Sequence, residues 1–347
     1  MELPSDMDAL VAGSAGRAGE ALANLALARV PRPRLAPGRV LVRIHAAPVN
    51  PADLLWLEGR YGIDRAFPAT PGFEGAGVVV ASGGGLLGRW LVGKRVACGG
   101  HTCSGTWAEF CLADADQCMP LRRDLAFEQG ATAMANPMTA IALVDLVRRG
   151  GHRAYVQNAA AGQLGRMIDA TAREAGIPGI HVVRRAEQAE ALRQAGAGNV
   201  LVSSDPGFET ALATRARELS ATIALDAVAG ASTGRLLGAL PRGGEVVVYG
   251  SLSGEPCGSI DPMALAFGAK RVRGFELVAH LRELGLVRAF LLGRAAQARV
   301  ASGRVETRIR SSVPLTAALA RLPEYVASMT EGKLILVPSD GPGSRAP

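Results

Sequence analysis

The spacing of apolar residues divides the chain into two regions. Over about residues 1 to 130, apolar and polar residues alternate in short runs, and glycines lie between the runs. The alternation is clearest at 40–45, and the runs at 75–80 and 94–98 have the same character. A period of two is typical of strands with one buried face, so this region is predicted to be mostly β.

From about residue 133 the period changes. Short apolar runs now alternate with longer segments of helical periodicity, and six runs are predicted to be strands: 153–158, 180–183, 199–203, 222–227, 245–249 and 271–275. Repeated strand–helix units predict an α/β fold with a doubly wound parallel sheet. A helical segment from about 280 to 330 precedes a last strand at 333–337. The predicted domains are therefore 1–132, 133–275, and a return to the first domain over 276–347.

The first strand of the second region leads into a glycine-bearing turn. Ala160, Gly162 and Gly165 occupy the three places of a dinucleotide-binding turn, and Gln163 and Leu164 lie between the last two. Gly162 would let the backbone approach phosphates, and Gly165 would let the helix pack closely on the strand. Alanine in the first place weakens the match. The pattern still predicts a pyrophosphate at the N-terminus of the following helix.

Two arginines end the next predicted strand. About 20 residues beyond such a turn, an enzyme for NAD carries an acidic residue that binds the ribose 2′-hydroxyl. Arg184 and Arg185 stand there instead. They favour NADP(H), whose 2′-phosphate an acidic residue would repel. The alternative is that both are solvated arginines in an arginine-rich chain.

Composition narrows the possible partners and compartment. The net charge is +7, but only three of the 38 basic residues are lysines, and no basic run exceeds two residues. This bias is compositional and argues only weakly for nucleic acid, whose recognition motifs are missing. No apolar run is long enough to span a membrane, and the acidic start at 1–6 does not resemble a targeting segment. The odd number of cysteines, five, suits a reducing cytosol, so the expectation is a cytoplasmic protein that binds small molecules.

A series of motifs, in one order along the chain, resembles the medium-chain dehydrogenase/reductase superfamily. The resemblance covers about residues 8 to 337, and within the superfamily the chain looks like the zinc-independent quinone reductases and 2-enoyl thioester reductases. It rests on the motifs at 48–53, 58–62, 68–75, 105–109, 136–140, 158–165, 182–184, 242–244, 249–250, 273–275 and 332–336. It implies a GroES-like catalytic domain, a Rossmann NADP-binding domain, and a homodimer joined at the sheet edge formed by 271–275 beside 246–248.

The zinc positions of the superfamily carry other residues in this chain. Zinc alcohol dehydrogenases have a thiolate where Asn50 stands and an imidazole where Phe73 stands, and neither replacement is a normal zinc ligand. The remaining possibility is a structural zinc on the four cysteines at 98, 103, 111 and 118. Their spacing departs from that of the zinc-bearing relatives, so no metal is expected, and the four are interpreted as separate thiols.

The resemblance also assigns roles to single residues. Tyr61 matches the catalytic tyrosine of the enoyl thioester reductases; a phenol has an ordinary pKa near 10 and can donate to an enolate oxygen at neutral pH. The alternative is a tyrosine packed at the rim of the site. Trp107 is expected in the substrate pocket or, alternatively, in the core, and Asn50 and Asp53 either contact substrate or order their loop.

Further positions are implied to contact the cofactor. They are Asn136, Thr139, Tyr249, Gly250, Phe275, Leu277 and Lys333. One departure is at Glu276, where enoyl reductases commonly have an aromatic residue, and this puts the acyl pocket in doubt. The expected function is an NADPH-dependent reductase of activated C=C bonds, above all 2-enoyl thioesters. The alternatives are an NADPH:quinone or enone reductase and a non-catalytic NADPH-binding protein.

Overall fold

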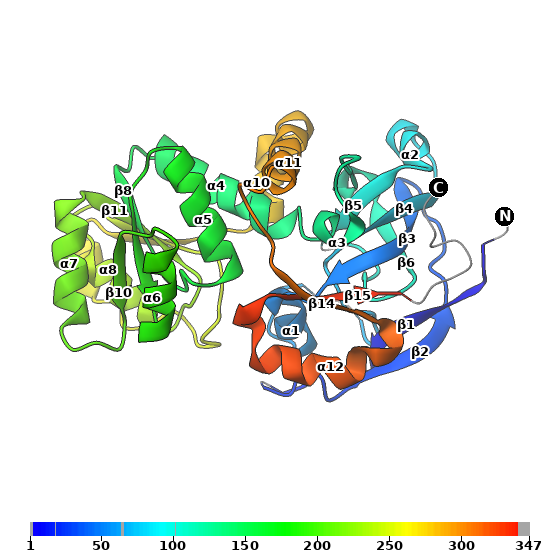
Figure 1. The fold of residues 1–347 in the computed structure, drawn as a ribbon, viewed down its shortest axis with the longest axis horizontal. Coiled ribbons are helices and arrows are strands. Elements are labelled where there is room, and N and C mark those ends of the chain that lie inside the picture. The colour runs from blue at the N-terminus through cyan, green and yellow to red at the C-terminus, as the bar shows by residue number, and fades with distance from the viewer. Residues whose placement is uncertain (1–2, 18, 64–65, 101, 339–347) are drawn as a thin grey trace. The chain divides into compact units, whose positions relative to one another are not determined.

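The computed structural model describes residues 3–17, 19–63, 66–100 and 102–338 of the chain, so the first two residues of the acidic start lie outside it. Contacts divide the chain into two compact units, Met1–Ala135 with Gly293–Pro347, and Asn136–Leu292 (Figure 1). Helix α11 (Leu286–Ala301) runs from the second unit into the first. The domain limits drawn from the sequence, 132/133 and 275/276, therefore stay a prediction.

The first unit is built on a seven-stranded sheet. Its strands run in the order β14-β15-β3-β4-β5-β7, and β6 pairs with β3. Their bounds are β3 Arg39–Pro48, β4 Glu74–Ser82, β5 Arg95–Gly99, β6 Phe110–Asp114, β7 Met119–Pro120, β14 Ile309–Pro314 and β15 Lys333–Val337. A separate hairpin pairs β1 (Asp6–Ala12) with β2 (Leu25–Pro31). The strands predicted at 40–45, 75–80, 94–98 and 333–337 are confirmed.

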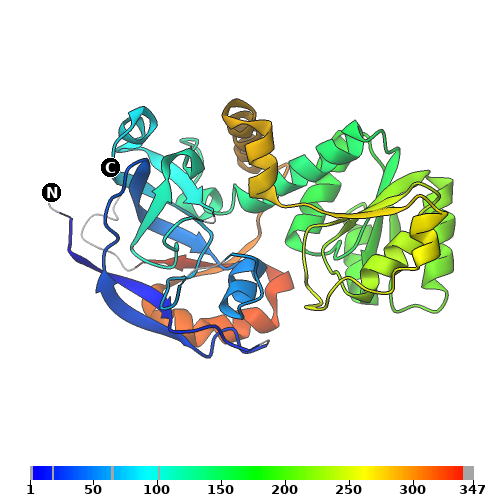
Figure 2. The ribbon, with the colours of Figure 1, turned by 180° about the vertical axis from the view of Figure 1, so that it is seen from behind.

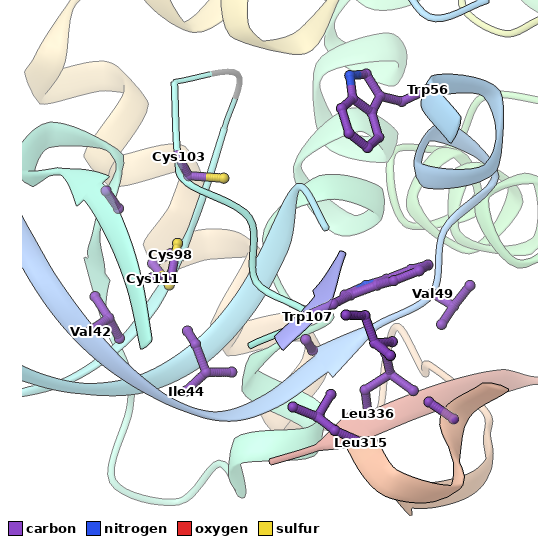
Figure 3. Close-up of a cluster of buried hydrophobic side chains, with 14 of the residues drawn as sticks. Val42, Ile44, Val49, Trp56, Cys98, Cys103, Trp107, Cys111, Leu315 and Leu336 are labelled. Carbon is purple, nitrogen blue, oxygen red and sulfur yellow. The ribbon is translucent and has the colours of Figure 1, made fainter. Parts of the chain in front are cut away.

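Short helices lie around this sheet. They are α1 Pro51–Leu57, α2 Leu86–Leu91, α3 Phe127–Gly130 and α12 Leu315–Ala327, with 3₁₀ turns η1 Ala115–Gln117 and η2 Met329–Glu331. The core between these elements is apolar and contains Trp107, which lies beside Val49 and Leu336 in Figure 3. Strand β15 adds to β3 in antiparallel register, with Leu336 opposite Ala47. The last strand of the chain is thereby placed next to the segment that leads into α1.

The second unit is a six-stranded sheet in which every neighbouring pair is parallel. The strand order is β10-β9-β8-β11-β12-β13, with bounds β8 Ala154–Gln157, β9 Gly179–Val183, β10 Asn199–Val202, β11 Ala221–Asp226, β12 Glu245–Val248 and β13 Arg271–Gly274. In order of the chain this is 3-2-1-4-5-6, so the doubly wound sheet is confirmed. Ligands of such sheets bind beyond the carboxyl ends of the strands, where the order reverses between β8 and β11.

Helices connect the strands of the second unit, and one further helix stands before and one after them. The connecting helices are α5 Gln163–Glu174, α6 Ala186–Gln194, α7 Phe208–Glu218, α8 Ala231–Ala239 and α9 Pro262–Ala266; α4 Ala135–Arg149 precedes β8 and α10 Leu277–Leu284 follows β13. The buried face of α5 carries Met167, Ile168 and Ala172, a helical spacing that matches the periodicity of the sequence. Among the described residues, no helix is both long enough and apolar enough to cross a membrane.

Candidate active site

The turn between β8 and α5 has the close approach that its third glycine predicts. A Cβ added at Gly165 would lie 2.7 Å from the carbonyl oxygen of Ala160, so a larger residue would push the helix off the turn. Gly162 is the N-cap residue of α5, and Gln163 and Leu164 follow it in the first turn, all half-buried. The first N–H groups of a helix have no intrahelical acceptor, so this end of α5 presents donors to an anion.

The turn contains one non-glycine residue with a left-handed backbone. The residue with a left-handed backbone is Ala159, at φ 47°, rather than Ala160 in the first fingerprint place. Ala160 is buried and donates its N–H to the carbonyl oxygen of Val182 at 3.2 Å. Ala160, in the first of the three places of the dinucleotide-binding turn, is therefore buried and hydrogen-bonded to the neighbouring strand β9.

The two predicted 2′-phosphate ligands follow β9 directly. Arg184 and Arg185 are both exposed, and their backbone N–H groups donate to Oε1 of Gln188 at 3.3 and 3.2 Å. The hydroxyl of Ser204, beyond the neighbouring strand β10, donates to the carbonyl oxygen of Arg184 at 3.2 Å. The main chain at the two arginines is thus held from two sides while their guanidinium groups face solvent. Sequence reasoning missed Gln188 and Ser204, which lack a motif of their own.

Three further predicted cofactor positions lie at the carboxyl ends of β12 and β13. Tyr249 donates its N–H to the carbonyl oxygen of Asp226 at 2.9 Å, and a Cβ at Gly250 would lie 2.7 Å from the carbonyl oxygen of Ala227. Phe275 donates its N–H to the carbonyl oxygen of Val248 at 2.8 Å. The main chain is therefore fixed at Tyr249 and Phe275 and closely packed at Gly250, beyond the carboxyl ends of the strands, where ligands of doubly wound sheets bind.

The residue that departs from the family pattern has a structural function. Glu276 is the N-cap of α10, and its carboxylate accepts from the N–H groups of Val278 at 2.7 Å and Ala279 at 2.6 Å. Leu277, the next predicted cofactor position, begins this helix and is half-buried. Asn136 and Thr139 lie in the first turns of α4 and are also half-buried.

In the first unit, a buried polar network surrounds the start of α1. Asp53 accepts the N–H of Asn50 at 2.7 Å and the N–H of Phe73 at 3.0 Å. The Asn50 amide donates to Oε2 of Glu74 at 3.2 Å, and its oxygen accepts from Nζ of Lys333. Asn50, Asp53, Glu74 and Lys333 are each at most 8% exposed. The side chain of Asn50 is thus fixed at both ends.

Glu74 and Tyr325 extend this network to other elements. Oε1 of Glu74 accepts from the N–H groups of Met134 at 3.1 Å and Ala135 at 2.7 Å, which are the donors at the start of α4. The hydroxyl of Tyr325, in α12, donates to the carbonyl oxygen of Val49 at 2.8 Å. Sequence reasoning placed neither residue in the site. The motif at 68–75, which contains Glu74, and the small number of tyrosines, four in the chain, were the available signals.

Burial shifts the titration of the network. It raises the pKa of Asp53 from 3.8 to about 7 and also raises the pKa of Glu74, although the nearby Lys333 opposes both shifts. Burial lowers the pKa of Lys333, while the two carboxyl groups favour its charged form. One ammonium therefore faces two carboxyl groups in a water-poor region, where removing any partner leaves a poorly compensated charge.

Tyr61 belongs to an aromatic cluster beside this network. Its ring lies 5.3 Å from the ring of Phe73 at an interplanar angle of 43°. Phe73 in turn contacts Trp56 edge-on at 6.2 Å, and Trp56 stacks on Phe67 at 5.1 Å. Trp56 is 2% exposed, whereas Tyr61 is half-buried. The Tyr61 ring is therefore packed against Phe73, while the residue as a whole is partly exposed.

Two predicted site residues are placed differently. Trp107 is 0% exposed, and its indole N–H donates to the carbonyl oxygen of Pro48 at 3.3 Å, so it lies in the core rather than on a pocket wall. The ammonium of Lys333 is bound to Val49 and Asn50 inside the first unit. These contacts give the buried ammonium partners within the first unit, and its expected contact with the cofactor stays a prediction.

The former zinc positions are occupied by contacts within the chain. Asn50 binds Glu74 and Lys333, and Phe73 packs on Tyr61. Four cysteines, Cys98, Cys103, Cys111 and Cys118, are buried, and Cys257 is exposed. In Figure 3 the side chains of Cys98 and Cys111 lie close together. Within the described part of the chain, no group of three or more His, Cys, Asp or Glu residues is arranged to hold a metal ion.

Comparisons with known proteins agree with this architecture. Residues 36–123 match the alcohol dehydrogenase GroES-like domain. The chain is 30% identical to a bovine mitochondrial enoyl-[acyl-carrier-protein] reductase over 285 residues, which cover 79% of this chain and 73% of the relative. It is 29% identical to the mitochondrial enoyl-[acyl-carrier-protein] reductase of Arabidopsis thaliana, with 70% of this chain and 65% of the relative covered.

Solved structures extend the likeness over both units. A protein from Mesorhizobium loti with a provisional assignment as an NADPH:quinone reductase has a TM-score of 0.89 at 34% identity, covering 97% of this chain and 100% of its own. A mycobacterial protein solved in complex with NADPH has a TM-score of 0.80 at 25% identity, with 96% and 100% covered. The glycine-bearing turn, the two arginines after β9 and the aromatic cluster around Tyr61 therefore lie on a scaffold shared with these proteins.

Proposed function

Because the chain belongs to the zinc-independent branch of the medium-chain dehydrogenase/reductase superfamily, we propose that it reduces activated C=C bonds, above all those of 2-enoyl thioesters. It is an oxidoreductase whose cofactor is NADPH and whose substrates are small molecules. The observation that carries the choice of substrate is the placement of Tyr61, whose half-buried ring rests on Phe73. Enoyl reduction needs a donor of this kind, and quinone reduction has no α-carbon to protonate.

The described residues fit a dinucleotide phosphate. Gly165 leaves room for the close approach of turn and helix, and the N-terminus of α5 offers backbone donors. Arg184 and Arg185 present exposed guanidinium groups for the 2′-phosphate. The remaining contacts are assigned to Asn136, Thr139, Ala160, Gly162, Gln163, Leu164, Tyr249, Gly250, Phe275 and Leu277.

The chain's own residues contribute orientation and a hydrogen-bond donor. Bound NADPH would supply a hydride to the β-carbon of the substrate. The C=C electron pair then forms the enolate double bond and the carbonyl π pair moves onto oxygen, where the Tyr61 hydroxyl stabilises the charge by donating a hydrogen bond. Water supplies the proton that adds to the α-carbon, and the carbonyl double bond is restored as the new C–H bond forms. Asn50 and Asp53 order the start of α1, which leads to Tyr61: the N–H of Asn50 donates to Asp53, and the Asn50 amide donates to Glu74.

A substrate panel tests the proposal. Crotonyl thioester, a simple enone and a quinone are each offered with NADPH and with NADH. We expect turnover of the thioester and the enone with NADPH. Reduction of the quinone alone would favour the second candidate, an NADPH:quinone reductase, which the likeness to the Mesorhizobium loti protein supports. Binding of NADPH without turnover of any substrate would indicate a non-catalytic binding protein.

The second unit also offers a surface for a homodimer. Strand β13 is an edge strand of the parallel sheet, and its residues are mostly exposed. Next to it in the chain, Met263 and Phe267 are 53% and 70% exposed, which is unusual for large apolar side chains. Figure 2 shows this segment in yellow. We assign the dimer to pairing of β13 across a two-fold axis. A monomer mass by light scattering at micromolar concentration would contradict it.

The proposed compartment is the cytoplasm. All five cysteines are free, and four of them are buried as thiols, which suits a reducing environment. The curated relatives are named mitochondrial, so fractionation of cells that express the chain would decide between the two compartments.

A further inference from the structure

We propose that Phe73 and Asp53 are positioning residues for Tyr61, with Asp53 fixing the backbone of Phe73 and Phe73 fixing the phenol ring. The inference rests on the proposed function, because it assigns Tyr61 the donor role. Phe73 stands at the position where zinc-bearing relatives have an imidazole ligand. In this chain its ring would support Tyr61 instead of a metal-binding group.

The main chain at Phe73 is held on both sides. Its N–H donates to Oδ1 of Asp53 at 3.0 Å, and its carbonyl oxygen accepts from the N–H of Gly100 at 2.9 Å. The preceding Gly72 has φ 98°, and a Cβ there would lie 2.3 Å from Oγ1 of Thr106. Only glycine fits this turn without strain. The Phe73 ring therefore projects from a backbone with little freedom.

Asp53 joins this turn to the helix that leads into Tyr61. Its second oxygen accepts the N–H of Asn50 at 2.7 Å, so one carboxyl group bridges the start of α1 and the start of β4. The chain leaves α1 through backbone hydrogen bonds from Gly59 to Trp56 and from Arg60 to Leu55, at 2.9 and 2.8 Å. Both the segment that carries Tyr61 and the ring on which it rests are thus fixed to α1.

The contact between the rings has a direct consequence for chemistry. A tyrosine ring on an unsupported loop would sample several rotamers, and its hydroxyl would be correctly placed for only part of the time. The Phe73 ring, 5.3 Å away, limits these orientations. A donor that is aligned before the reaction need not be reordered as the negative charge develops, and small misplacements can cost large factors in rate.

A double-mutant cycle on turnover tests this coupling. The variants are Phe73→Leu, Tyr61→Phe and the combination, with crotonyl thioester, enone and quinone as substrates. We expect Phe73→Leu to lower kcat for the thioester and enone about tenfold, with KM for NADPH and quinone turnover nearly unchanged. Once Tyr61→Phe is present, Phe73→Leu should cause little further loss, because its effect passes through the hydroxyl. Phe73→Tyr keeps the ring and should retain most of the activity.

The matched control is Phe67→Leu. Phe67 belongs to the same aromatic cluster and pairs with Trp56, so this change removes a similar ring and reports the general cost of loosening the cluster. We expect it to lower thermal stability as Phe73→Leu does, with little effect on kcat. Asp53→Asn replaces one of the two carboxylate oxygens that accept the N–H groups of Asn50 and Phe73. It should lower kcat for the same substrates, by a smaller factor than Phe73→Leu.

The outcomes separate the inference from the function on which it rests. If Tyr61→Phe leaves thioester and enone turnover intact, the proposed donor role is wrong. If Tyr61→Phe lowers turnover but the losses of the two single variants multiply in the combination, Phe73 does not act through Tyr61. Equal kcat losses for Phe67→Leu and Phe73→Leu would also overturn the positioning role.

Discussion

Lys333 donates a hydrogen bond from Nζ to the carbonyl oxygen of Val49 at 3.3 Å, across 284 positions of sequence. Val49 in turn donates its N–H to the carbonyl oxygen of Leu334 at 3.0 Å. The last strand and the loop before α1 are therefore joined by main-chain and side-chain contacts at one point. The buried network, and with it the loop that leads to Tyr61, depends on residues near the end of the described chain.

Replacement of Lys333 by Met should destabilise the protein strongly. The apolar stem is kept, but Asp53 and Glu74 lose the buried ammonium that compensates them. Removing one partner of a buried ionic group typically costs about 3–5 kcal/mol in the free energy of unfolding. Urea denaturation measures the change. The control is Lys94→Met, which removes an ammonium lying over the Trp90 ring and should cost about 1 kcal/mol or less. Equal losses in the two variants would contradict the assigned role of Lys333.

The pH dependence of stability should contain a contribution from Asp53. Its pKa is raised from 3.8 to about 7 in the folded protein, chiefly by burial, so the folded state binds the proton more tightly than the unfolded state. The resulting stabilisation is fully present below about pH 4 and is lost as the pH rises through about 7. Asp53→Asn should remove this component. Unfolding curves that change with pH identically in both proteins between about pH 4 and 8 would show that Asp53 does not titrate there.

The preference for NADPH should depend on the two exposed arginines. Replacing both Arg184 and Arg185 by Ala removes the charged donors proposed for the 2′-phosphate, and KM should rise much more for NADPH than for NADH. Arg193→Ala is the control, because Arg193 is an exposed arginine in the last turn of α6. Its removal should leave both constants unchanged. Equal use of both cofactors by the unmodified protein would refute the prediction.

Tyr61→Phe should lower kcat while leaving KM for NADPH nearly unchanged. The ring and its contact with Phe73 are kept, but the donor to the developing enolate is lost. The loss of one such donor typically costs on the order of 10²–10³ in turnover. Initial rates with crotonyl thioester and enone measure the effect, and quinone reduction serves as the internal comparison. Full thioester turnover in the variant would mean that Tyr61 only lines the site.

The purified protein should contain well under one equivalent of zinc. The superfamily's catalytic zinc positions carry Asn50 and Phe73, both engaged in contacts within the first unit. Elemental analysis after purification without added zinc measures this, and chelators should leave activity unchanged. A stoichiometric zinc that is lost with Cys103→Ser would show that the four buried cysteines form a metal site.

Local pattern was enough to predict the fold class, but it missed β14, which lies in a segment predicted to be helical, and it did not predict the placement of several site residues. The period-two runs that became β3, β4 and β5, and the alternating units that became β8 to β13, each depend on neighbours in sequence. Lys333 shows the limit, because a lysine near the end of a chain carries no sign that a loop almost three hundred residues earlier will bury it. Trp107 shows another, because a tryptophan after a Gly-Thr pair suits a pocket wall as well as a core. Proposed roles that depend on the bound cofactor, such as those of Asn136 and Leu277, stay predictions.

The carboxylate of Glu276 caps α10 at a position that the family resemblance assigns to the acyl pocket. It accepts two N–H groups at the start of α10, at the position where related enoyl reductases carry an aromatic residue. An aromatic ring introduced there would leave both donors without their acceptor, and losing an N-cap typically costs about 1 kcal/mol. A change toward the family's acyl pocket therefore needs a second substitution that restores a cap to α10. If position 276 lines the acyl pocket, as the family resemblance implies, then substrate range and the stability of α10 both depend on this one side chain.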